Sequence, residues 1–392
     1  MADSPYSMGS HRGKIKDKLS SSRPVPRPRR FAPYTVAQKE ASQAYDKILA
    51  TLYGHVVGDA VGHLTETLSK EQALKVYGAV SKELELVHKK LLNDSTRRKW
   101  AIGDWTEESD MMLIILESLL YCKGQINEVD LAKRLMDWSE RGFPELNDIC
   151  GQGLDSYTKS VIVHPQFSET PKHAAEICWR NGQQQLSAGN CAVYRTSALG
   201  LHYYNAHAKV IQNTIEVCSI THQDPRCMAS CVAVTTAISL MMQNKHIKKN
   251  GQLDVEELIG ECYRYASHCL NGRPKEEFKS LKKHMQAISL KDLKLGDIGN
   301  MSFTFKAMGA GFWALKQNDF RTAIQEIVME GGDSDANASV AGALLGCKLG
   351  YSAIPQSWIE GLKFRSWLDD LVNRYLHMME RGRALPKSES AV

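Results

Sequence analysis

Three acidic segments hold the side chains best suited to chemistry in this chain. They are WTEESD (Trp105–Asp110), GGDSDAN (Gly331–Asn337) and GDAVGHLTE (Gly58–Glu66). Carboxylates are the ligands that hard divalent cations prefer, and two aspartates one residue apart on a glycine-led turn, as in the second segment, can converge on one cation. No acidic residue stands at the twelfth position of that turn, where an EF-hand requires one. The pattern therefore predicts a cation site of another kind.

Each acidic segment also has a purely structural interpretation. Acidic residues in the first turn of a helix interact favourably with its dipole and need no function, and an aspartate or threonine ahead of a helix is a common cap. Thr106 is the expected cap of a helix that begins with Glu107 and Glu108. Zinc is not favoured, because Cys227 and Cys231 lie in an apolar helical stretch without a second pair of ligands.

The elements that must position these segments are helices. Apolar side chains recur at helical spacing in 45–52 and 111–119, and alternation typical of a strand is clearest in the short stretch Ser160–Val163. We therefore expect an all-α bundle whose functional loops lie at helix N-termini. Further helices are expected at Val129–Arg141, Pro171–Trp179, Ala206–Ile220, Cys227–Gln243, Val255–Cys269, Phe303–Lys316, Phe320–Val328, Ala336–Leu349 and Leu362–Met379.

Small residues recur every fourth position in one of these helices. Ala338, Gly342 and Gly346 share a face, which allows a neighbouring helix to approach closely. This helix follows the GGDSDAN segment directly. Its central packing would therefore fix the acidic residues at its N-terminal end.

Composition and charge divide the chain into an arm and a body. Of the 392 residues 43% are hydrophobic and 24% charged, which is typical of a globular protein. Residues 1–32 carry eight Lys or Arg against two acids, so the remainder is close to neutral. We predict a disordered basic Ser/Pro/Arg-rich arm at 1–40, a single all-α domain at 41–385 and a flexible C-terminus at 386–392.

This division bears on partners and compartment. A near-neutral body argues against nucleic-acid binding except through the basic arm. No stretch is predicted to span a membrane, since the longest charge-free run, 227–244, contains several polar residues. The ten cysteines lie in apolar stretches, which favours reduced thiols in the cytoplasm or nucleus. A mitochondrial presequence is the alternative interpretation of the Arg/Ser-rich arm.

The order of the motifs resembles the ADP-ribosylglycohydrolase family. GDAVGHLTE, WTEES and GGDSDANASVAGALLG are similar to three family motifs, and the intervening segments 142–156, 187–201 and 221–227 resemble its glycine-rich loop, its GNGxAMR-type loop and its TH-x-DP segment. The resemblance covers about residues 45–355. The family includes ADP-ribosylarginine and ADP-ribosylserine hydrolases, dinitrogenase reductase-activating glycohydrolase and the J-type lens crystallins. The resemblance implies a compact all-α fold.

The resemblance also implies a function and a set of site residues. The implied reaction is the metal-dependent hydrolysis of an ADP-ribosyl glycosidic bond, with ADP-ribose or an ADP-ribosylated protein as partner, two Mg²⁺ ions that bind the ribose hydroxyls and a metal-bound water as nucleophile. Glu66 and Asp335 would be catalytic. The implied metal ligands are Thr106, Glu107, Glu108, Asp333 and Asp335, and the implied substrate-binding residues are Gly151, Gly153, Asn190 and His222.

Three positions depart from the family pattern. Glu107 and Glu108 replace aspartates, and each added methylene moves a carboxylate by about 1.5 Å. Ala336 replaces a hydroxyl ligand. Because Mg²⁺ demands near-ideal octahedral geometry, the site could hold one ion, a larger ion such as manganese or calcium, or none. The alternative function is therefore a catalytically silent member that binds ADP-ribose or serves a crystallin-like structural role.

Overall fold

The computed structural model describes residues 43–86, 92–181 and 188–384, all of which belong to one unit within Pro33–Val392. The predicted arm at 1–40 and the predicted C-terminal segment at 386–392 lie outside the described residues. The α-helices are α2 (Gln43–Gly62), α3 (Lys70–Tyr77), α4 (Glu107–Tyr121), α5 (Glu128–Arg141), α6 (Ser156–Ile162), α7 (Pro171–Arg180), α8 (Cys191–Arg195), α9 (His207–Ser219), α10 (Pro225–Met242), α11 (Val255–His268), α12 (Lys275–Met285), α13 (Leu290–Leu293), α14 (Thr304–Leu315), α15 (Phe320–Val328), α16 (Ser334–Leu349), α17 (Gln356–Gly361) and α18 (Arg365–Ala384).

The expectation of an all-α fold is confirmed. Short 3₁₀ turns join the helices, and the only β-type pairing among the described residues consists of two isolated bridges. The nine helices expected by range all form, with ends that shift by a few residues. The expected strand at Ser160–Val163 is wrong, because this stretch completes α6. The side chain of Asp155 accepts a hydrogen bond from the Thr158 N–H, and this cap favours a helix over a strand.

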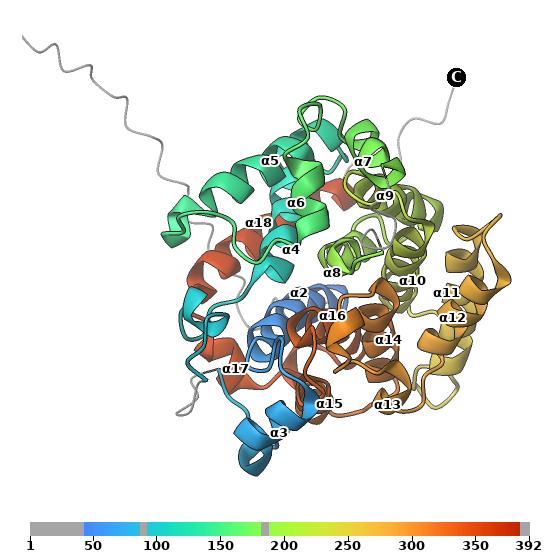
Figure 1. Cartoon of the computed structure of the whole chain (residues 1–392). Helices are drawn as coiled ribbons and strands as arrows, with labels where there is room; N and C mark the ends of the chain where they lie inside the picture. Colours follow the sequence, from blue (N-terminus) through green and yellow to red (C-terminus); the bar gives the residue numbers. More distant parts are fainter. Residues whose placement is uncertain (1–42, 87–91, 182–187, 385–392) are drawn as a thin grey trace, which may run out of the picture. The chain divides into compact units, whose positions relative to one another are not determined.

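Helices α2 and α16 form the centre of the unit and lie side by side (Figure 1). Glycines let their backbones touch: a β-carbon on Gly342 would lie 1.9 Å from the Gly54 oxygen, and one on Gly346 would lie 2.2 Å from the Ala50 oxygen. A β-carbon on Gly58 would likewise lie 2.1 Å from the Ala338 oxygen. Residue numbers at these contacts increase along α2 while they decrease along α16, so the two helices are antiparallel. The small-residue face predicted for α16 is this contact.

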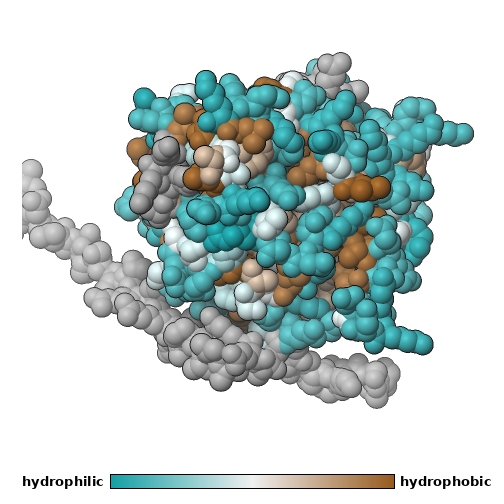
Figure 2. Space-filling model, turned by 90° about the horizontal axis from the view of Figure 1, so that it is seen from below, coloured by the Kyte–Doolittle hydropathy of each residue, from teal (hydrophilic) through white to brown (hydrophobic). Residues whose placement is uncertain are grey.

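Other helices surround the central pair. Helices α14, α15, α4 and α8 contact α16 or α2, and α10 packs against α9, α11 and α14 (Figure 1). By length and composition α10 is apolar enough to cross a membrane, but 83% of it is buried inside the protein. This agrees with the expected core helix. On the face drawn in Figure 2, hydrophilic side chains predominate and the hydrophobic areas are interrupted by them.

Candidate active site

The central helix pair brings two of the acidic segments together. Antiparallel packing places the C-terminal end of α2 beside the N-terminal end of α16, where a β-carbon on Gly62 would lie 2.4 Å from the Asp335 Cα. The Ser334 hydroxyl donates to the Gly62 oxygen over 2.8 Å. Beyond the helix ends, the Thr67 N–H donates to the Gly332 oxygen over 2.7 Å. The segment that carries Glu66 is thus tied to the segment that carries Asp333 and Asp335.

Asp59 attaches the third acidic segment to α2. Its carboxylate accepts hydrogen bonds from the backbone N–H and hydroxyl of Thr106 and from the backbone N–H and hydroxyl of Ser109. Asp59 is fully buried. Burial raises its pKa, and the four donors act in the opposite direction. The sequence contained Asp59 in the GDAVGHLTE motif but gave no sign that it would hold the start of α4.

Thr106 occupies the predicted position ahead of α4 but does not cap the helix with its side chain. Its hydroxyl lies 2.5 Å from Asp59 Oδ1 and 2.5 Å from Glu108 Oε2. The main-chain oxygen of Glu108 accepts a hydrogen bond from His55 Nε2 over 3.1 Å. Burial lowers the pKa of His55 to about 4, so its imidazole is neutral. These contacts fix the first turn of α4 against α2.

Five carboxylates from the three segments share one buried region: Glu66, Glu107, Glu108, Asp333 and Asp335. Burial raises the pKa of Asp335 well above its usual range, and the charges of Glu108 and Glu66 add to the increase. Burial and then the neighbouring carboxylates also raise the pKa values of the two glutamates at the start of α4 and of Asp333. Such mutual repulsion among largely desolvated carboxylates favours the uptake of protons or of cations.

The turn that carries Glu66 is held by an arginine that the sequence did not single out. Arg97 donates to the main-chain oxygens of His63, over 3.1 Å, and Glu66, over 2.9 Å. Its guanidinium is paired with Asp94 at 2.8 Å, and the residue is buried. On the same turn, His63 Nδ1 lies 2.9 Å from Glu66 Oε2 and 3.9 Å from Asp335 Oδ2.

Two groups of side chains in this region could hold a metal ion. His63, Glu66 and Asp335 form one group, Glu108, Asp333 and Asp335 form the other, and the ligand atoms within each group lie within 4.8 Å of one another. Both groups share Asp335, and oxygen donors dominate both. This donor set fits divalent cations. Glu107 belongs to neither group, although its charge acts on Glu108 and Asp335.

The predicted substrate-binding residues do not all lie beside the carboxylates. The Asn190 side chain donates to Asp333 Oδ2 over 3.1 Å. Gly153 has a φ of +85°, and a β-carbon there would lie 1.7 Å from Glu107 Oε2, so this loop lies directly against that carboxylate. Gly151 instead faces Trp138, whose main-chain oxygen is 2.7 Å from the position of a β-carbon.

The contacts of His222 are with other residues than the acidic cluster. It is fully buried, its Nδ1 lies 2.8 Å from the Thr221 hydroxyl, and its ring packs against that of Tyr157 at 5.3 Å. Burial lowers its pKa to about 3, and the positive charge of Arg195 acts in the same direction. None of these contacts joins His222 to the carboxylates, so its predicted place on the adenosine side stays a prediction.

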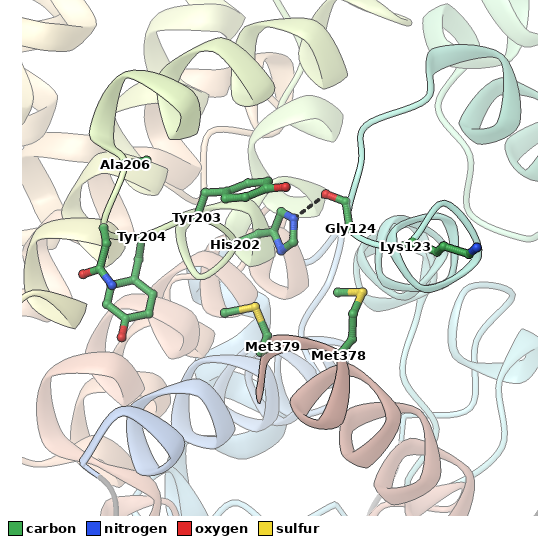
Figure 3. Close-up of a pocket in the computed structure, with 9 residues that line it drawn as sticks. Lys123, Gly124, His202, Tyr203, Tyr204, Ala206, Met378 and Met379 are labelled. Atoms are coloured by element: carbon green, nitrogen blue, oxygen red, sulfur yellow. Dashed lines mark hydrogen bonds between the residues drawn. The ribbon is translucent and has the colours of Figure 1, made fainter. Parts of the chain in front are cut away.

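A separate cavity of about 200 Å³ lies elsewhere on the unit (Figure 3). Met378 and Met379 of α18 line one side, and Tyr203 and His202 line another. His202 Nε2 lies 2.7 Å from the Gly124 oxygen. Because none of its lining residues is acidic, this cavity is not a second cation site.

A comparison with known proteins identifies the family. The model of the ADP-ribosylglycohydrolase family matches residues 40–384. The chain belongs to this family. The expected resemblance is therefore confirmed, and with it the expectation of a hydrolase that acts on ADP-ribosyl bonds.

Individual relatives are similar at low identity. ADP-ribosylarginine hydrolase Tri1 of Serratia proteamaculans is 21% identical over 86% of this chain and 81% of its own length. ADP-ribosyl-[dinitrogen reductase] glycohydrolase of Rhodospirillum rubrum is 20% identical over 82% of this chain and 92% of its own. A solved ADP-ribosylglycohydrolase-related protein complex aligns with a TM-score of 0.61 at 19% identity over 86% of this chain and 99% of that one. The solved structure supports the fold.

Proposed function

We propose that the chain removes ADP-ribose from a protein side chain by cation-dependent hydrolysis of the glycosidic bond. One observation carries this proposal: carboxylates from three segments far apart in the sequence converge in one region, where burial and the neighbouring charges raise the pKa values of Glu107, Glu108 and Asp335. A folded protein keeps such an arrangement at a cost in stability, which bound cations would offset. The relatives that act on ADP-ribosylarginine and on ADP-ribosylated dinitrogen reductase supply the substrate class.

Asp335 belongs to both groups of candidate ligands. It would hold one cation together with Glu108 and Asp333, and a second together with Glu66 and His63. Divalent cations, Mg²⁺ in the family, supply charge that orients the ribose hydroxyls and lowers the pKa of water. Thr106 would position Glu108 through the contact between its hydroxyl and Oε2.

Glu66 is suited to move the proton. About 20% of its side chain is exposed, whereas Asp335 is almost fully buried. In the proposed step, water attacks the anomeric carbon of the distal ribose and Glu66 accepts its proton. The bond from that carbon to the side-chain nitrogen or oxygen breaks, and the leaving group takes up the proton that Glu66 accepted from water. Asn190, bonded to Asp333, would keep this second carboxylate in place.

An assay on an ADP-ribosylated arginine peptide tests the proposal. We expect release of ADP-ribose by the native chain with a divalent cation, its loss after chelation, and a loss of at least about 100-fold in Asp335→Asn. Asp110→Asn is the matched control, because Asp110 is also a carboxylate of the first turn of α4, half-buried, but accepts hydrogen bonds from Trp105 and Trp138 instead. Equal turnover in native protein and Asp335→Asn would contradict the assignment. Serine-linked ADP-ribose is the second substrate to try.

A silent ADP-ribose-binding or crystallin-like role is the second candidate. The observation that favours it is Ala336, whose buried methyl group stands where the family has a hydroxyl ligand. Under this alternative the native chain has no turnover on any ADP-ribosylated side chain. The combined changes Glu107→Asp, Glu108→Asp and Ala336→Thr would then create activity.

A further inference from the structure

We propose that His63 is a nitrogen ligand of one cation position and makes that position selective for a first-row transition dication over Mg²⁺. The inference rests on the proposed function, since it concerns the cation that this function requires. Its structural basis is that His63 Nδ1 and carboxylate oxygens of Glu66 and Asp335 surround one point.

The two distances from His63 to the carboxylates are compatible with an octahedral ion. Two ligands at about 2.1 Å from such an ion lie about 3.0 Å apart when adjacent and about 4.2 Å apart when opposite. His63 Nδ1 is 2.9 Å from Glu66 Oε2, which fits adjacent ligands, and 3.9 Å from Asp335 Oδ2, which is close to the value for opposite ligands. A small rearrangement of the side chains would therefore complete the coordination.

The histidine is held in place from several sides. Its backbone N–H donates to the Asp59 oxygen over 3.0 Å, and its oxygen accepts from Arg97 over 3.1 Å. Its ring packs against Trp100 with centroids 4.7 Å apart and planes at 66°. The second ring nitrogen, Nε2, is buried and has no hydrogen-bond partner in the described part of the chain.

The imidazole would also replace a cation ligand that is missing next to Asp335. Ala336, next to Asp335, has no side-chain oxygen to offer, whereas His63 approaches Asp335 from the turn that follows α2. A nitrogen donor is poorly suited to Mg²⁺, which prefers carboxylate, carbonyl and water oxygens. Transition dications accept mixed nitrogen and oxygen ligands. The exchange of a hydroxyl for an imidazole would thus change which ion the site prefers.

Mn²⁺ is the probe for the test, because pulsed electron paramagnetic resonance detects a nitrogen atom bonded directly to it. We expect nitrogen modulation from Mn²⁺ bound to the native full-length chain and its loss in His63→Asn. His202→Asn is the matched control, since His202 is also buried but lies in the cavity of Figure 3 and contacts the Gly124 oxygen. By calorimetry, the ratio of Mn²⁺ to Mg²⁺ affinity should fall about tenfold in His63→Asn and stay unchanged in the control.

The outcomes separate this inference from the proposed function. If native protein binds Mn²⁺ without nitrogen modulation, the inference is wrong even if ADP-ribose is released. This measurement does not depend on the folding of any variant. Modulation that persists in His63→Asn also overturns it. Modulation that is present in native protein and lost in His63→Asn supports the inference even if no ADP-ribosylated peptide is cleaved, in which case only the proposed function fails.

Discussion

The replacement Gly342→Ala tests whether contact between the α2 and α16 backbones sets the geometry of the acidic site. A β-carbon at this position would lie 1.9 Å from the Gly54 oxygen, whereas ordinary contacts begin at 3.4 Å. The helices would therefore have to separate locally by about 1.5 Å. Main-chain atoms cannot move aside as a flexible side chain does, so we expect a loss of about 3 kcal/mol in the free energy of unfolding, the upper end for overpacked cores.

The same separation should impair cation binding two turns away. Metal sites tolerate ligand displacements of only about 0.2 Å, and Asp335 precedes Gly342 on the same helix. Urea unfolding followed by circular dichroism, with and without Mn²⁺, measures both effects. The matched control is Gly260→Ala in α11, where a β-carbon would meet nothing within 4 Å, so we expect a gain of up to about 1 kcal/mol. An unfolding midpoint for Gly342→Ala equal to the native one, with the cation effect retained, would refute the reasoning.

Three further perturbations address the parts around the site. Asp59→Asn should lower the free energy of unfolding, measured by urea titration, by about 2 kcal/mol. The reason is that the variant loses a buried carboxylate that accepts hydrogen bonds from Thr106 and Ser109. A free energy of unfolding equal to the native one would show that these bonds contribute little. Burial lowers the pKa of His222 from 6.5 to about 3. Between these pH values His222 is therefore protonated in the unfolded chain and neutral in the native one. Stability should accordingly fall as the pH drops from about 6.5 towards 3, and His222→Gln should flatten this dependence in thermal unfolding between these values. Deletion of residues 1–40 should leave the release of ADP-ribose unchanged, and loss of turnover would mean that the domain boundary lies earlier in the chain.

The helices could be predicted because their signals are local. Apolar spacing located eleven of them, and a four-residue repeat of small side chains identified the face on which α16 meets its neighbour. Helix α6 was missed because seven residues are too few for a helical period to stand out from an alternating pattern. Its cap, Asp155, was the signal that could have corrected this interpretation.

The site was predictable as three separate acidic segments, and their order supplied the family. Its supporting contacts were not predictable, since they join residues distant in the chain. Nothing near Asp59 in the sequence indicates that it accepts hydrogen bonds from Thr106, and nothing near Arg97 indicates that it binds the turn at His63. The role of His63 depends on Asp335, which is 272 residues away and reaches it only through the packing of the central pair.

The pairing of α2 with α16 also has a consequence for how the chain acquires its site. The two helices are separated by more than 250 residues, so the site forms only after a very long loop has closed. Loop closure costs conformational entropy that local contacts cannot repay, and contacts of high sequence separation are associated with slow folding. During synthesis, Glu66 and Glu108 leave the ribosome long before their partners on α16. Cation binding should therefore arise late, as a property of the finished chain and of no shorter N-terminal fragment.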